Sequence, residues 1–195
     1  MTAPDSLRNV FEWDDLVICP LTTEDVAELP LDFCTDDDLN DFFKSDCLIY
    51  ERGLWVKNYK VLYKESHVVL GLVSLLNDAL RFQAKAQKRK FTPHLKNWME
   101  SHPAMMVGRF AIRKELSGKG IGSKALNLLK AFFLDANRTG CRFLTVDAYN
   151  HPQVIAFYQR NGFVPIRTEA ALASEDARTV SMFFPLFTLF ETPAT

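Results

Sequence analysis

Residues 104–138 read AMMVGRFAIRKELSGKGIGSKALNLLKAFFLDANR and contain three successive signals. The segment AMMVGRFAI, residues 104–112, is apolar apart from Arg109 and predicts a central strand. Apolar side chains recur at helical spacing between Gly120 and Asn137, so this segment predicts an amphipathic helix. The turn SGKGIG, residues 117–122, joins the strand to the helix. It therefore lies at a helix N-terminus, where backbone N–H groups lack intrahelical partners.

The turn predicts a binding site for an anion. Its three glycines let the backbone turn sharply and expose successive N–H groups, and Lys119 adds a positive charge. The expected ligand is a phosphate or pyrophosphate, although such turns are also common as tight connections. A nucleotide-binding P-loop is excluded because GxxxxGK[ST] is absent. A dinucleotide fingerprint is excluded because the turn comes late, after three predicted strands.

The whole chain predicts a mixed sheet. Strands are predicted over residues 16–21, 55–63, 67–76, 104–112, 142–147, 163–166 and 178–187, and helices over 39–52, 120–137 and 152–160. Gly53 is expected to end the first helix, and Asn161-Gly162 to end the last. This order indicates the α+β (mixed α/β) class, with helices on the faces of the sheet.

Domain boundaries follow from composition. Residues 1–14 are expected to be a leader, and residues 15–195 a single domain. The polar, basic segment 81–103 reads as an insertion or a mobile lid. Within it, KAQKRK carries four positive charges, at Lys85, Lys88, Arg89 and Lys90.

Composition limits the classes of function. The formal net charge of −1 gives no global drive toward nucleic acid or anionic membrane. No signal pattern or apolar run of about 18 residues occurs, so we expect a cytoplasmic protein without membrane contact. The four cysteines are Cys19, Cys34, Cys47 and Cys141. They form no CxxC pair, which indicates reduced thiols and no metal site.

A downstream segment carries a family resemblance. Asn150-His151-Pro152, Ala156-Phe157-Tyr158 and Asn161-Gly162-Phe163 follow the strand RFLTVD. Together with the turn they resemble the GNAT (GCN5-related N-acetyltransferase) superfamily, whose acetyl-CoA motif is written Q/R-x-x-G-x-G/A. Ser117, Gly120 and Gly122 match the motif, except that Ser117 replaces Gln or Arg.

The resemblance covers residues 15–187 and is most specific over 104–166. The stretches LPLDFCTDDDLNDFFKSDCLIYERG and GLVSLLNDAL are similar to one branch of the superfamily. That branch includes toxins that acetylate the amino group of aminoacyl-tRNA. The implied GNAT fold has a central, mostly antiparallel sheet of about six or seven strands with helices on both faces. Two of its strands splay apart.

The resemblance implies a binding mode for acetyl-CoA, the co-substrate. The backbone of Phe110, Ala111 and Ile112 would face the pantetheine arm between the splayed strands. Asn150 matches a position that often hydrogen-bonds the cofactor, but it is equally suited to cap the following helix. The residues of the turn would hold the pyrophosphate: Ser117, Gly118, Lys119, Gly120, Ile121 and Gly122.

The implied reaction is direct attack of a neutral amine on the thioester, through a tetrahedral intermediate. Tyr158 matches the family's general acid, and its alternative role is that of a core tyrosine. Arg109 either faces the acceptor or extends its charge to solvent. No general base is identified. Asp78, Glu100, His102 and Asp147 are candidates by residue type, with surface or structural roles favoured.

The acceptor is left open by the sequence. The leading interpretation is a primary amine on a small molecule or peptide. The alternative is aminoacyl-tRNA, bound through Lys85, Lys88, Arg89 and Lys90. A third interpretation is a non-catalytic module that binds acetyl-CoA. A homodimer is considered as well.

Overall fold

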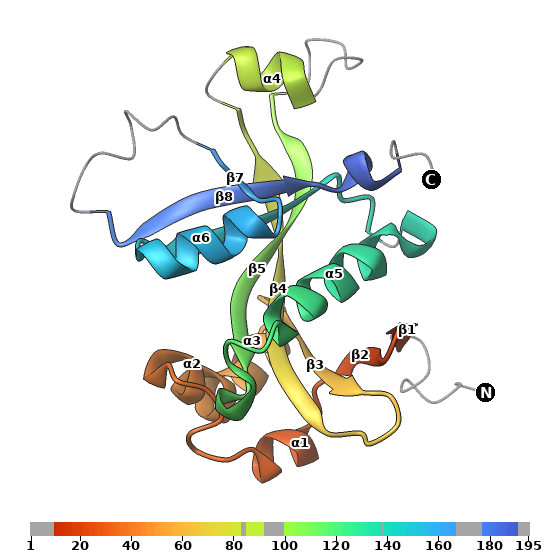
Figure 1. Ribbon diagram of the computed structural model, residues 1–195, viewed down its shortest axis with the longest axis vertical. Helices are drawn as coiled ribbons and strands as arrows, with labels where there is room; N and C mark the ends of the chain where they lie inside the picture. The colour runs from red at the N-terminus through yellow and green to blue at the C-terminus, as the bar shows by residue number, and fades with distance from the viewer. Residues whose placement is uncertain (1–9, 83–84, 92–99, 138, 167–176, 191–195) are drawn as a thin grey trace. The chain divides into compact units, whose positions relative to one another are not determined.

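The computed structural model describes residues 10–82, 85–91, 100–137, 139–166 and 177–190 (Figure 1). The chain forms two compact units. Unit 1 contains residues 1–76 and 107–135, and unit 2 contains residues 77–106 and 136–195. Two strands, β4 (Val69–Leu80) and β5 (His102–Ile112), run through both units. This division was not predicted from the sequence.

Unit 1 begins with an antiparallel meander. β1 (Phe11–Trp13), β2 (Leu16–Pro20) and β3 (Lys57–Tyr63) pair in this order, and β3 continues the sheet into β4. The predicted first strand and hairpin are therefore confirmed. β1 lies within the segment that was expected to be a leader. Asp14 adopts a left-handed φ of 54°, and this turns the chain tightly from β1 into β2.

Side-chain caps at Thr22 and Asp36 begin the first two helical segments of unit 1. α1 (Thr23–Glu28) starts with a capping box between Thr22 and Asp25. The predicted helix over 39–52 is confirmed as a continuous run of α2 (Asp37–Asp41), the π-helical η2 (Phe42–Asp46) and α3 (Cys47–Arg52). Its expected end at Gly53 is confirmed, because the last helical residue is Arg52 and Gly53 is the C-cap.

The residue with the left-handed conformation at the end of α3 is not the glycine. Gly53 has an ordinary φ of −75°, whereas Leu54 is left-handed with a φ of 60°. The N–H groups of Leu54 and Trp55 then bond back to the carbonyl oxygens of Glu51 and Tyr50, both at 3.0 Å. This is a Schellman end with leucine, rather than glycine, in the left-handed position.

The sheet of unit 1 is covered on both faces. Leu72 of β4 and Ala111 of β5 belong to a buried cluster with side chains of the α1–α3 region, such as Phe43. The opposite face carries Tyr59, whose ring lies 5.6 Å from that of Phe132 in α5 (Ile121–Leu134). The predicted helix over 120–137 is thus confirmed. Its regular part ends at Leu134, because the short 3₁₀ turn Asp135–Asn137 contains a left-handed Ala136.

Unit 2 contains the remaining predicted elements. β6 (Phe143–Tyr149), β7 (Val164–Pro165) and β8 (Thr179–Pro185) confirm the three last predicted strands, and α6 (Pro152–Arg160) confirms the last helix. The described residues contain two further short 3₁₀ helices, which are Lys114–Leu116 in unit 1 and Leu186–Leu189 in unit 2.

The strand order is β1-β2-β3-β4-β5-β6-β8-β7, with eight strands instead of about six or seven. β5 and β6 are parallel, whereas β1–β2, β2–β3, β3–β4, β6–β8 and β7–β8 pair in antiparallel fashion. The parallel pairing extends only from Ala104–Phe143 to Met106–Thr145. β5 nevertheless continues to Ile112 and β6 to Tyr149.

The sheet of unit 2 is also covered on both faces. On one face, Phe82, Phe91, Phe143 and Phe183 form an aromatic cluster that includes the end of α4 (Lys85–Phe91). On the other face, Phe184 contacts Phe163, which follows the Asn161-Gly162 end of α6. Adjacent residues of a strand point to opposite faces, so Phe183 and Phe184 divide between the two layers.

Three expected absences concern the described residues. All four cysteines are free thiols, and Cys34 and Cys47 are buried. Within the described part of the chain, no group of three or more His, Cys, Asp or Glu side chains is placed to hold a metal ion. In the same residues, every helix is too short or too polar to span a lipid bilayer.

Candidate functional site

The turn after β5 has the backbone conformation that its glycines permit. Gly118 and Gly120 are left-handed, with φ of 73° and 81°, and Gly120 is the N-cap of α5. A Cβ atom added to either glycine would have no neighbouring atom within 4 Å. Glycine is therefore required here by backbone conformation and not by crowding, and the space beside the turn is open.

The turn also presents unpaired donors. The N–H of Lys119 bonds to the carbonyl of Leu116 at 3.3 Å, and that of Ser123 to Gly120 at 3.1 Å. Among the described residues, no protein acceptor is recorded for the N–H groups at Gly118, Gly120, Ile121 and Gly122. Unpaired donors at the start of a 14-residue helix favour a phosphate or pyrophosphate, so the turn fits this part of acetyl-CoA.

Most cations near the turn are engaged by neighbours in unit 1. Lys114 forms an ion pair with Asp32, and Lys124 contacts Asp15 at 3.2 Å. Arg113 donates from Nε to the carbonyl of Val69 at 2.8 Å. Lys119 is exposed and, within the described residues, has no carboxylate within 4.0 Å. It is therefore the cation of the turn that remains available to an anionic ligand.

The last residues of β5 lead directly into the turn. Ala111 is buried, whereas Phe110 and Ile112 are half-buried. A Cβ atom on Gly71 of β4 would lie 2.9 Å from the carbonyl oxygen of Ala111. This close approach fixes β4 along one edge of β5. The pairing of the other edge with β6 ends at Met106, before these three residues.

Asn150 belongs to unit 2, where it follows β6. Its Nδ2 donates to the carbonyl of Ala177 at 3.0 Å, and its N–H donates to Arg178 at 3.0 Å. The N-cap of α6 is His151, which makes no side-chain capping bond. The alternative role of Asn150 as a helix cap is therefore wrong, and its amide instead ties the end of β6 to the chain before β8.

Tyr158 is a buried residue of α6, with 7% of its surface exposed. Its ring lies 5.1 Å from that of Phe157 and 5.3 Å from that of Phe163. Burial raises the pKa of Tyr158 above its ordinary value, because the phenolate would lose its hydration. The hydroxyl is therefore protonated at neutral pH, and it is a weaker acid than an exposed tyrosine.

Arg109 makes specific contacts inside unit 1. Its guanidinium lies 3.8 Å from the carboxylate of Asp38 in α2, and 5.2 Å from the ring centre of Phe42. Nη1 donates to the carbonyl of Gly108 at 3.1 Å. These contacts give Arg109 a structural role between β5 and the helix. Its contact with a substrate stays a prediction.

The four candidate bases differ in their surroundings, all within unit 2. Asp78 accepts from the hydroxyl of Thr145 at 2.5 Å, and Asp147 accepts from Ser181 at 2.5 Å. Glu100 is exposed. His102 is 1% exposed, with Phe82 and Phe143 beside it. Burial above all lowers the pKa of His102, and the cations Lys88 and Arg142 lower it further, so it is a neutral core residue.

The basic segment is held to unit 2 by its last residues. Phe91 is buried, with its ring 5.0 Å from that of Phe183. Gln87 donates from Nε2 to the carbonyl of Pro165 at 3.1 Å. Lys85, Arg89 and Lys90 are exposed. The expected insertion or lid therefore contains a helix anchored in the aromatic cluster, while residues 92–99 lie outside the described residues.

Charge is divided unequally between the two units. Unit 1 contains 17 Asp and Glu against 12 Lys and Arg, which is a formal net charge of −5. Unit 2 contains 7 acidic against 11 basic residues, which is a net charge of +4. The total of −1 therefore conceals a basic unit that could attract a polyanion. Sequence reasoning missed it because the boundaries of the units are discontinuous in the chain.

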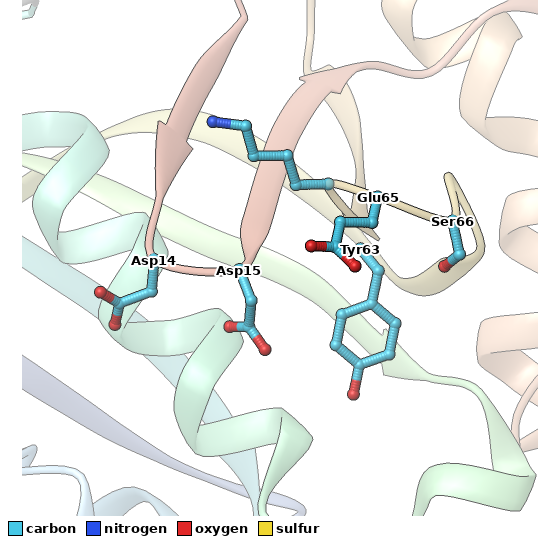
Figure 2. A pocket seen from close by; sticks show the side chains of 6 residues that line it. Asp14, Asp15, Tyr63, Glu65 and Ser66 are labelled. Carbon is cyan, nitrogen blue, oxygen red and sulfur yellow. The ribbon is translucent and has the colours of Figure 1, made fainter.

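Figure 2 shows a pocket of unit 1 at the tips of two hairpins. It is lined by Asp14, Asp15, Tyr63, Lys64, Glu65 and Ser66. Lys64 pairs with Glu12, and the three carboxylates of the lining repel an anion. This pocket is unsuited to a phosphate, in contrast to the turn before α5.

Comparisons with known proteins agree with this geometry. Residues 61–165 match the sequence model of the acetyltransferase (GNAT) domain. A search of curated protein sequences found no match. Among solved structures, the chain is similar to a variant of KacT, with 19% identity and a TM-score of 0.67 over 91% of this chain and 99% of that one.

Two further structures are similar along nearly their whole length. AtaT complexed with acetyl-methionyl-tRNAfMet is 22% identical, with a TM-score of 0.66 over 91% of this chain and 98% of that chain. AtaTR bound with AcCoA is 26% identical, with a TM-score of 0.62 over 92% of this chain and 100% of that chain.

Proposed function

Because the chain belongs to the acetyltransferase (GNAT) domain family, we propose that it transfers the acetyl group of acetyl-CoA to the amino group of an aminoacyl-tRNA. The chain is an acetyl-CoA-dependent N-acetyltransferase, and the acceptor is the proposed part. The observation that supports this acceptor is the net charge of +4 on unit 2, compared with −5 on unit 1. A free small amine would need no such basic surface.

The donor side of the reaction is assigned to unit 1. Acetyl-CoA supplies the thioester when bound. The N–H groups at Gly118, Gly120, Ile121 and Gly122 bind its pyrophosphate, with the charge of Lys119 beside them. Ser117 opens this turn and brings no cation. The backbone of β5 from Phe110 to Ile112 pairs with the pantetheine arm, since the pairing of β5 with β6 ends at Met106.

The proton needed by the leaving thiolate is assigned to Tyr158. Its hydroxyl is protonated at neutral pH, which is the form a general acid needs, and the raised pKa makes it a weaker acid than an exposed tyrosine. A thiol has an ordinary pKa of about 8.5, so a thiolate can leave without full protonation. Tyr158 therefore accelerates the reaction without being indispensable. Asn150 is assigned to cofactor binding through its side-chain oxygen, which takes no part in the bond from Nδ2 to Ala177.

The acceptor side is assigned to α4. Phosphate contacts require cations that are held in place and accessible to a polyanion. Lys85, Arg89 and Lys90 are exposed, and Phe91 anchors their helix in the aromatic cluster. Lys88 is half-buried on the same helix. AtaT, whose fold is similar, was solved in complex with acetyl-methionyl-tRNAfMet, which supports testing this class of acceptor first.

The test is transfer of label from acetyl-CoA to charged tRNA, uncharged tRNA, small amines and peptides. We expect label on charged tRNA, with a rate that falls as salt concentration rises. Replacing Lys85, Arg89 and Lys90 with Gln should lower this rate about tenfold or more, and should make it less sensitive to salt. The affinity for acetyl-CoA should remain, because the turn lies in unit 1.

A matched control replaces Lys57 and Lys64, two exposed cations of unit 1, with Gln. This variant should acetylate tRNA at the normal rate. Label on small amines or peptides alone would contradict the tRNA acceptor and favour the simpler amine. Tight binding of acetyl-CoA with no labelled product on any amine would instead indicate a non-catalytic module.

A further inference from the structure

Four exposed apolar side chains surround the end of α3. Leu54 is 92% exposed and Trp55 74%, and the preceding residues Ile49 and Tyr50 are 59% and 47% exposed. We call these four residues the α3 patch. Single exposed apolar residues are common on protein surfaces, but large ones that cluster mark a contact surface. The proposed acetyl transfer uses none of them.

Backbone hydrogen bonds hold the main chain of the two most exposed residues of the α3 patch in place. The N–H groups of Gly53, Leu54 and Trp55 each bond to a carbonyl of α3 at 3.0 Å. A Cβ atom on Gly53 would lie 2.8 Å from Cδ1 of Trp55, so the indole ring lies directly against this glycine. The backbone that carries Leu54 and Trp55 is therefore ordered before a partner binds, which lowers the entropic cost of binding.

The residues before the α3 patch define the charge of that partner. Residues 36–52 carry six carboxylates against Lys44 and Arg52, a formal net charge of −4. Lys44 is already used, because its Nζ donates to three carbonyl oxygens around the end of α1, at 2.8 to 3.1 Å. Four carboxylates of this helical run are exposed, at Asp37, Asp38, Asp41 and Asp46. Asp38 already lies 3.8 Å from the guanidinium of Arg109, and Asp46 lies one helical turn before Ile49 and Tyr50 of the patch.

We propose that the α3 patch and the exposed acidic side of α2–α3 bind a cationic segment of another protein. An apolar side chain of that segment would contact Leu54 and Trp55, and its Lys or Arg residues would meet the carboxylates. Tryptophan is typical of the residues that dominate binding energy at protein interfaces. Opposite charge would steer the partner to this face, whereas nucleic acid and anionic lipid are repelled by the net charge of −4.

The probe is a fluorescently labelled amphipathic peptide of leucine and lysine, with a leucine–glutamate peptide of the same pattern as its counterpart. Fluorescence anisotropy measures the Kd of each peptide for the full chain. We expect the lysine peptide to bind and the glutamate peptide not to bind. Trp55→Ala should weaken binding about tenfold or more, as for a central interface residue. The triple change of Asp37, Asp41 and Asp46 to Asn should weaken it and reduce its dependence on salt.

Leu54→Gly separates binding from folding. Glycine suits the left-handed φ of 60°, so this variant should unfold at the same or a higher temperature. It should still bind the lysine peptide more weakly than the unchanged chain. Trp13→Ala, at a tryptophan of β1 that is 39% exposed, is the matched control and should leave the Kd unchanged.

Three results would overturn the proposal. The first is equal binding of the lysine peptide by the Leu54→Gly, Trp55→Ala and unchanged chains. The second is equal binding of both peptides. The third is a dimer, seen by sedimentation, that Trp55→Ala dissociates, because the patch would then bind a second copy of this chain.

Discussion

Arg142 donates from Nη2 to the carbonyl oxygen of Phe91 at 3.4 Å, across 51 positions of sequence. Its guanidinium also lies 3.9 Å from the ring centre of Phe187. One side chain thus holds the C-terminal end of α4, where a cation complements the helix dipole, to the 3₁₀ helix after β8. The position of the basic helix in unit 2 therefore depends on a residue that carries no sequence signal of its own.

Arg142→Leu should loosen α4. We expect a loss of about 1–3 kcal/mol in the free energy of unfolding, from the hydrogen bond and the contact with Phe187. Urea denaturation measures this loss. Acetylation of charged tRNA should decrease more than the affinity for acetyl-CoA does. Arg178→Leu, which removes an exposed arginine near Tyr149, should change stability by less than about 0.5 kcal/mol. Equal effects of the two changes would contradict the special role of Arg142.

Gly120→Ala should weaken the binding of acetyl-CoA. The left-handed φ of 81° costs about 1–2 kcal/mol with a Cβ atom, and the new methyl group enters the open space beside the turn. Isothermal titration calorimetry should show a Kd at least about tenfold higher, as for a lost pyrophosphate contact.

Gly140→Ala is the control for backbone strain. Gly140 has a φ of 65° and equally open surroundings, but it lies in the loop before β6, in unit 2. We expect a similar loss of stability and an unchanged Kd for acetyl-CoA. If both variants lose the same affinity, the effect at Gly120 is one of folding and not of ligand contact.

Tyr158→Phe should lower kcat several-fold or more and leave KM for acetyl-CoA unchanged. The ring contacts with Phe157 and Phe163 are retained, so stability should change little. Because the pKa of Tyr158 is raised, its hydroxyl remains protonated to alkaline pH. The rate of the unchanged enzyme should therefore rise with pH as the amine loses its proton, and not fall before about pH 10. An unchanged kcat in the variant would remove Tyr158 from the mechanism.

Lys130→Met should stabilise the protein at neutral pH. Lys130 of α5 is 6% exposed, donates to Oδ1 of Asn127 at 3.1 Å, and has its pKa lowered by burial from 10.5 to about 8. The folded state consequently holds its proton less tightly than the unfolded state, and stability rises as pH increases from about 8 to about 10.5.

The gain from Lys130→Met should be largest below pH 8, at about 1–3 kcal/mol, and should fade toward pH 10.5. Urea denaturation across this pH range measures it. A gain that does not vary with pH would show that packing, and not the buried charge, is responsible.

Local patterns predicted most of the secondary structure. The strand before the turn, α5 and α6 were correct because periodic apolar residues, a glycine-rich N-terminus and an Asn-Gly end act within a few residues. β1 and the left-handed Leu54 are among the features that were not predicted. Both depend on conformations that Asp14 and Leu54 adopt only because neighbouring strands or helical carbonyls hold them.

The candidate site was predictable in part for the same reason. The N–H groups of the turn belong to one continuous segment, so their proximity follows from the chain itself. The sequence is compatible with two roles for Asn150. The bond from its amide to Ala177, 27 positions away, distinguishes between them. The burial that raises the pKa of Tyr158 likewise exists only in the folded chain, where the rings of Phe157 and Phe163 lie beside its own.

The sequence by itself determined the donor side: an αL-compatible glycine turn before an amphipathic helix, which backbone sterics and unpaired N–H groups make suitable for pyrophosphate. Only the tertiary structure decided which charges belong together. The two units take their residues from separate segments, so a chain of net charge −1 divides into −5 and +4. Electrostatic potential depends on distance in space and not along the chain, and folding alone sets those distances.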